Sequence, residues 1–150
     1  MDATDKRILR LLQENAGLSL ADLASCVGLS TTPVWRRVKA LEEAGVIVKR
    51  TTLLDAGKLG LGVTVFVGVR TNQHTAEWLE RFAAAVASYP EVTEVHRLSG
   101  ETDYLLKVVV ADIQGYDRFY KKLIAIGGMT DVSSSFAMEQ IKYTTALPIE

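Results

Sequence analysis

The sequence has a single cysteine, Cys26, and no apolar run long enough to cross a membrane. One cysteine cannot form an intrachain disulfide, and its place on a predicted helix indicates a small buried apolar side chain. The N-terminus, MDATDKRILR, is charged from its start, unlike a secretory signal peptide. We therefore expect a soluble protein of the reducing cytoplasm.

The residue sets that carry catalysis or bind metals are also missing. His74 and His96 lie far apart, with no third ligand at metal spacing. No Ser/His/Asp set, glycine-rich phosphate loop or pair of carboxylates in a defined cleft can be identified. The sequence thus predicts no enzyme, no cofactor and no metal site.

Neither sign of charge is in large excess, since the formal net charge is −1. Residues 1–50 hold eight Lys/Arg and six Asp/Glu, whereas residues 51–150 hold nine and twelve. Residues 30–39 contain three cations and no acid. The balance argues against a nonspecific polyanion binder, and the local excess indicates one cationic helix.

That helix is the second of a pair predicted within residues 19–43, joined by a tight turn. Ser19 and Ser30 are suited to begin the two helices. Gly28 supplies the positive φ that the turn requires. The buried face of the second helix is predicted to contain Val34, Val38 and Leu41.

The opposite face carries hydroxyl and guanidinium groups, which can bind base edges and phosphates. With a further helix over 4–15, the pair forms a helix-turn-helix. Arg36 lies opposite the buried face and is predicted to contact a base, while Arg37 and Lys39 contact phosphate. Trp35 either packs on a neighbouring helix or lies against the DNA backbone. The full predicted DNA-binding set is Ser30, Thr31, Thr32, Trp35, Arg36, Arg37 and Lys39.

The rest of the chain predicts a second domain of class α+β. A strand at 46–48 and a glycine-rich hinge lead into it. The predicted strands are 63–71, 92–99, 104–111 and 132–143, and the helices are 75–89 and 112–126. Their βαββαβ order is ferredoxin-like. The predicted division is a three-helix domain at 1–50, a hinge at 51–61 and a ferredoxin-like domain at 62–150.

The first strand of that sheet is apolar on both faces. Its valines alternate with Thr64, Phe66 and Gly68, although a solvated face would be polar at every second position. Helices cover one face of such a sheet, so the other is expected to meet a second copy of the chain. A dimer would place two helix-turn-helix units on a pseudo-palindromic operator.

Five segments carry a resemblance that spans the chain: DATDKRILRLLQEN, LADLASCVGLSTTPVWRRVKALEEAGVI, LSGETDYLLKVVV, YDRFY and SSSFAMEQIKYTTALPIE. They are similar to the Lrp/AsnC (feast/famine) family of transcriptional regulators. SSFAMEQIKYTT and STTPVWRRV are most similar to a branch that includes cysteine-responsive detoxification regulators. Relatives often have cysteine where this chain has Val34, an exchange of one apolar side chain for another.

The resemblance implies that the first domain binds DNA and that the second is ACT-like. This second domain dimerises, assembles into tetramers or octamers, and binds a small effector between subunits. The effector is usually an amino acid, with cysteine the first candidate. Family members bind it with one loop and a facing strand. Here these correspond to Ser99, Gly100, Glu101, Thr102, Asp103 and Tyr104, and to Ser134, Ser135, Phe136 and Ala137.

An amino acid needs an anionic acceptor for its ammonium group and donors for its carboxylate, and Asp103 supplies the acceptor. The alternative is a hairpin turn in which Asp103 binds its own backbone. Two other functions stay open. One is an architectural DNA-wrapping protein with little effector dependence, and the other is an allosteric enzyme subunit, which the lack of catalytic residues disfavours.

Overall fold

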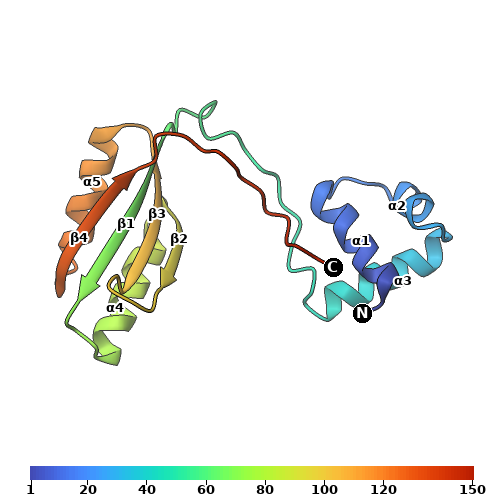
Figure 1. Ribbon diagram of the computed structural model, residues 1–150, viewed down its shortest axis with the longest axis horizontal. Coiled ribbons are helices and arrows are strands. Elements are labelled where there is room, and N and C mark those ends of the chain that lie inside the picture. Colours follow the sequence, from blue (N-terminus) through green and yellow to red (C-terminus); the bar gives the residue numbers. More distant parts are fainter. The chain divides into compact units, whose positions relative to one another are not determined.

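The computed structural model describes residues 1–150, which form two compact units. One contains residues 1–53 and 141–150, and the other contains 54–140. No helix in it is long and apolar enough to span a membrane. Figure 1 shows the elements α1 (Ala3–Glu14), α2 (Leu20–Val27), α3 (Thr31–Glu43), β1 (Val63–Thr71), α4 (Ala76–Ser88), β2 (Val92–Arg97), β3 (Tyr104–Val110), α5 (Ile113–Ile124) and β4 (Met129–Phe136).

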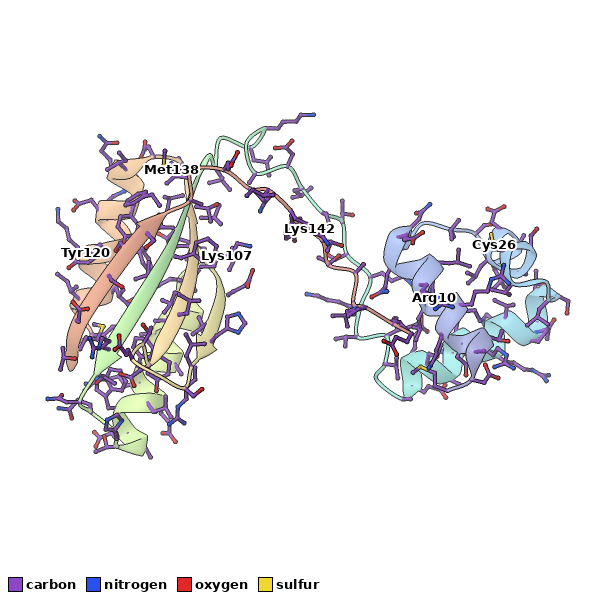
Figure 2. The ribbon with its side chains drawn as sticks, in the orientation of Figure 1. Arg10, Cys26, Lys107, Tyr120, Met138 and Lys142 are labelled. Atoms are coloured by element: carbon purple, nitrogen blue, oxygen red, sulfur yellow. The ribbon has the colours of Figure 1, made fainter.

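The first unit is built from α1, α2 and α3 around one small core. Ser19 caps the start of helix α2 with a side chain that accepts from the Asp22 amide, and Gly28, with φ +71°, caps its end. Leu23 and Ala24 form the buried side of α2. Cys26, labelled in Figure 2, is exposed, so the prediction that it is buried was wrong. The core consists of Ile8, Leu9, Leu23, Ala24, Val34, Val38 and Leu41.

The last residues of the chain pack on α1. The Gln13 side chain donates to the Leu147 carbonyl at 3.2 Å and accepts from the Leu147 amide at 2.6 Å. Arg10, labelled in Figure 2, donates to the Ile149 carbonyl at 3.4 Å, and Ile149 packs against the core. Residues 141–150 therefore belong to the first unit, whereas the sequence-based division places them in the second domain.

The second unit is a four-stranded antiparallel sheet in the order β2-β3-β1-β4, with α4 and α5 on one face (Figure 1). This confirms the predicted α+β fold and its βαββαβ order. The valines of β1 at 65, 67 and 69 are fully buried beneath the helices. They pack with the aromatic side chains of α4 and α5, chiefly Phe82 and Phe119.

Two predicted strand assignments were wrong. Residues 46–48 form no strand, since the amides of Val46 and Ile47 both donate to the Leu41 carbonyl and close the end of α3. Strand β4 ends at Phe136 rather than at residue 143. The Ala137 amide donates to the Thr64 carbonyl. Because β1 begins at Val63, it offers almost no backbone with which residues after Ala137 could pair. β-Forming residues make a strand only where a partner strand is available.

Consecutive glycines after α5 allow a close approach to α4. Gly127 and Gly128 have φ of +74° and +75°. The Trp78 indole donates to the Gly127 carbonyl at 3.0 Å, and the Thr71 hydroxyl donates to the Gly128 carbonyl at 2.5 Å. A Cβ at position 128 would overlap the Trp78 indole nitrogen, whereas one at 127 would meet nothing within 4 Å.

These positions give a matched test of packing in the second unit. We expect Gly127→Ala to lose roughly 1 kcal/mol of unfolding free energy, the cost of a positive φ. Gly128→Ala should lose about 3 kcal/mol, because Trp78 must also move. Urea unfolding in a Trp35→Phe background, followed by Trp78 fluorescence, measures both. Equal losses would contradict a packing role for Gly128.

Candidate DNA-binding and effector sites

Helix α3 presents one face to the core and the other to solvent. Val34 and Val38 are buried, whereas Arg36 and Lys39 are exposed and form no ion pair. Ser30 occupies the N-cap position, but its hydroxyl makes no capping hydrogen bond. The exposed hydroxyls at the start of α3 and the two free cations can therefore all bind an external anion or base edge. Thr31 and Thr32 are among these exposed residues.

Trp35 lies on the flank of α3, and 52% of its surface is exposed. It lines a shallow cavity of about 210 Å³ with apolar side chains from the first two helices and their connection, including Leu12, Leu20 and Leu23. Lys39 is on the same flank and lines the same cavity. One side of the indole thus faces neighbouring helices while the rest faces solvent.

Arg37 lies on the other flank, away from Trp35, and is engaged within the protein. Its Nη1 donates to Asp2 at 2.8 Å and to Asp5 at 2.7 Å. The two carboxylates raise the pKa of Arg37. The pKa of Asp2 is lowered, first by the Asp5 amide hydrogen bond and then by Arg37. Among the predicted DNA-binding cations, Arg37 alone has intramolecular ion-pair partners.

The loop between β2 and β3 is fastened to the end of β1 by Asp103. The Asp103 amide donates to the Val69 carbonyl at 3.0 Å, and the Thr71 amide donates to Asp103 Oδ2 at 2.8 Å. The other carboxylate oxygen of Asp103 makes no hydrogen bond. Gly100, with φ +130°, gives the loop its bend. Asp103 therefore binds the backbone of the neighbouring strand β1 rather than that of its own turn, and it keeps one free acceptor.

The predicted strand segment is divided between the two faces of the sheet. Ser134 pairs with Val67 and hydrogen-bonds Tyr116 of α5, and Phe136 also contacts the Tyr116 ring. Both side chains therefore face the helices, where burial raises the pKa of Tyr116. Ser135 pairs with Phe66 on the uncovered face.

Tyr104 also lies on the helix side. It is 8% exposed and packs against the rings of Trp78 and Phe82. Ser99 and Glu101 are exposed in the loop, and Ala137 extends the pairing of β4 with its amide. The structure therefore does not gather all ten predicted effector residues at one point.

The loop and β4 meet over Gly68, on the uncovered face. A Cβ at Gly68 would lie 2.8 Å from Ser133 Oγ and 3.3 Å from Thr102 Cγ2. Two hydroxyl side chains, one from the loop and one from the strand, thus occupy the space that Gly68 leaves. The sequence interpretation missed Gly68 and Ser133 as site residues. Strand alternation could have identified Ser133, since it lies on the same face as Ser135.

The uncovered face also carries apolar and charged side chains. Phe66 is 40% exposed at its centre, with Leu105 half-buried on the neighbouring strand. Farther along, Glu94 binds Lys107 at 2.9 Å and His96 at 3.3 Å. Lys107 chiefly, with His96, lowers the pKa of Glu94. An aromatic ring flanked by polar groups is typical of a protein interface.

Two protein-family models match the chain. The Lrp/AsnC ligand binding domain covers residues 64–147, and a winged helix-turn-helix DNA-binding model covers residues 1–48. The Escherichia coli K12 DNA-binding transcriptional activator DecR is 51% identical over 151 residues, covering 100% of this chain and 99% of the relative. The Zymomonas mobilis glutamate uptake regulatory protein is 49% identical, covering 99% and 91%.

Solved structures agree with these matches. An AsnC family transcriptional regulator from Agrobacterium tumefaciens is 59% identical, with a TM-score of 0.95 over 99% of this chain and 97% of that one. A Neisseria meningitidis transcriptional regulator, solved in complex with L-Met, is 39% identical, with a TM-score of 0.95 over 99% and 96%. The relatives are transcriptional regulators, not enzymes. With a DNA-binding and a ligand-binding part joined in one chain, the protein belongs to the Lrp/AsnC family of transcriptional regulators.

Proposed function

We propose that this regulator binds an amino acid where the loop 99–104 meets β4, and that binding changes its affinity for an operator. The proposal rests on one observation: the side chains of Thr102 and Ser133 both lie next to Gly68, on the uncovered face of the sheet. Two segments distant in sequence there contribute hydroxyls to one exposed face. Asp103, the residue after Thr102, has one carboxylate oxygen without a hydrogen bond.

The chemistry of these groups suits a zwitterion. Asp103 can accept from an ammonium group, and the hydroxyls of Thr102, Ser133 and Ser135 can donate to a carboxylate. Three side chains on the helix side of the sheet would hold β4 and the loop in place: Ser134, Phe136 and Tyr104.

The candidate effectors come from sequence resemblance and from the named relatives. The similarity to the cysteine-responsive branch suggests cysteine. The comparisons do not single out that branch, since the transcriptional activator DecR and a glutamate uptake regulatory protein match this chain with nearly equal identity. The glutamate uptake regulator and the L-Met complex add glutamate and methionine to the panel.

On the DNA side, Arg36 is the base-contacting residue, and the exposed groups Ser30, Thr31, Thr32, Trp35 and Lys39 contact the duplex around it. Two such helices, related by the two-fold axis of a dimer, would bind a pseudo-palindromic operator. A regulator that binds DNA in a bacterial cell acts in the cytoplasm, and this is the location that we propose.

The uncovered face of the sheet around Phe66 is the proposed dimer interface, and dimers assemble further into tetramers or octamers. An effector bound between subunits favours one arrangement of the assembly, and with it one spacing of the DNA-binding helices. By linkage, operator DNA changes effector affinity by the same factor.

The effector is tested by thermal unfolding against the common L-amino acids. A ligand at about 100 times its dissociation constant should stabilise the protein by roughly 2.7 kcal/mol. Asp103→Asn should abolish this response, because it removes the charge but keeps an acceptor for the Thr71 amide. Asp117→Asn, which removes an exposed carboxylate charge on α5, should retain it. A flat panel would contradict an amino-acid effector and favour the architectural alternative.

The DNA interface is tested at Arg36. We expect Arg36→Ala to weaken operator binding by roughly 1–3 kcal/mol and to relax discrimination at one base pair. Lys39→Ala should instead weaken binding to operator and random duplex alike. Fluorescence anisotropy titrations with both duplexes measure the difference. An equal loss on both duplexes for Arg36→Ala would make Arg36 a phosphate contact.

The interface is tested at Phe66. Phe66→Lys places a charge at the centre of the uncovered face and should convert the assembly to monomers at micromolar concentration. Ile113→Lys is the control, because Ile113 is 66% exposed at the start of α5. Analytical ultracentrifugation reports both. An unchanged assembly in Phe66→Lys would remove this face from the interface.

A further inference from the structure

One terminal nitrogen of Arg37 binds two carboxylates at the beginning of α1. Nη1 lies 2.8 Å from Asp2 Oδ2 and 2.7 Å from Asp5 Oδ1. The Asp5 side chain is 14% exposed and the Arg37 side chain 33%. The contact joins residues more than thirty positions apart in sequence and is partly shielded from solvent.

Both carboxylates are held by the backbone of α1. Asp2 Oδ1 accepts from the Asp5 amide at 2.9 Å, and Asp5 Oδ2 accepts from the Asp2 amide at 2.8 Å, in a reciprocal capping box. Each side chain therefore uses one oxygen to close the start of α1 and the other to bind Arg37. The acceptors for Arg37 are fixed in direction, unlike those of a flexible surface pair.

The position of Arg37 on α3 allows its ion pairs with Asp2 and Asp5 to fix the orientation of the helix. Val34 and Val38 bury the core side of the helix, and Arg37 lies on the flank between that side and the exposed face. Apolar packing is non-directional, but a charged hydrogen bond on the flank resists rotation of α3 about its axis. Arg36, the next residue, points in a direction that this rotation sets.

We propose that Arg37 is a positioning residue, which fixes α3 against α1 through Asp2 and Asp5 and does not contact DNA phosphate. The inference depends on α3 being the helix that enters the DNA groove, as in the helix-turn-helix family. It replaces the sequence-based expectation that Arg37 binds phosphate.

Neutralising Asp5 distinguishes the two roles by the sign of its effect. If Arg37 contacted phosphate, Asp5→Asn would remove one of the two carboxylates that hold its guanidinium group, lessen repulsion of the DNA, and tighten binding. If Arg37 positions α3, the same change loosens the helix and weakens operator binding. Asparagine keeps a side-chain oxygen that can cap α1, so the start of the helix is preserved.

The experiment uses the full-length protein and a duplex selected from a random library on the wild-type chain, with a random duplex alongside. We expect Asp5→Asn and Arg37→Met each to lower affinity for the selected duplex about tenfold, as the loss of one base contact does. Binding to the random duplex and the salt dependence should be unchanged. The double variant should bind no more weakly than Arg37→Met alone, because both changes break the same contact.

Glu43→Gln is the control for removing an acid, since Glu43 is exposed on α3 and has no ion pair. It should leave the affinity unchanged or raise it. Circular dichroism at the assay temperature checks that each variant is folded, and Asp5→Asn alone decides the sign if Arg37→Met does not fold.

Three results would overturn the inference. Tighter binding by Asp5→Asn would show that Arg37 is held back from phosphate. An equal loss on both duplexes in Arg37→Met, with the slope of log affinity against log salt reduced by about one, would make Arg37 a phosphate contact. Unchanged binding in both variants would show that the ion pairs do not matter for DNA recognition.

Discussion

The second unit depends on β1 having a hydrogen-bonded partner on each side. Its pairing with β3 brings the loop before β3 to one end of β1, where Asp103 binds Val69 and Thr71. Its pairing with β4 sets the register that turns Ser133 and Ser135 to one face and Ser134 to the other. A one-residue slip of that pairing would exchange the faces and place Ser134 beside Gly68. The proposed effector site is thus a product of strand register.

The first unit depends in a similar way on α1. Its inner side supplies Ile8 and Leu9 to the core, its first residues hold Arg37, and its last turns hold the end of the chain through Gln13. Helix α1 therefore determines how α3, the proposed DNA-binding helix, is presented. Mutations on α1 can change operator recognition without any contact to a base.

The sequence was sufficient for what local periodicity and capping determine. It predicted all five helices, the βαββαβ order along the chain and the turn at Gly28, because each is specified within a few residues. It also placed Arg36 opposite the buried face of α3. The division of residues 134–137 between two faces could not be fixed, since it requires the register of β4 on β1. The Arg37 ion pairs were missed because helical spacing gives a residue's face on its own helix but not the neighbour that it meets.

The docking of Leu147 and Ile149 on α1 makes the DNA-binding unit discontinuous in sequence. A chimera that exchanges sensing domains at one junction near residue 53 would therefore take the last ten residues from the wrong parent. Two junctions, the second near residue 140, keep the native segment with Gln13. The same topology means that a fusion partner attached after Glu150 is carried by the DNA-binding unit, not by the ligand-binding one.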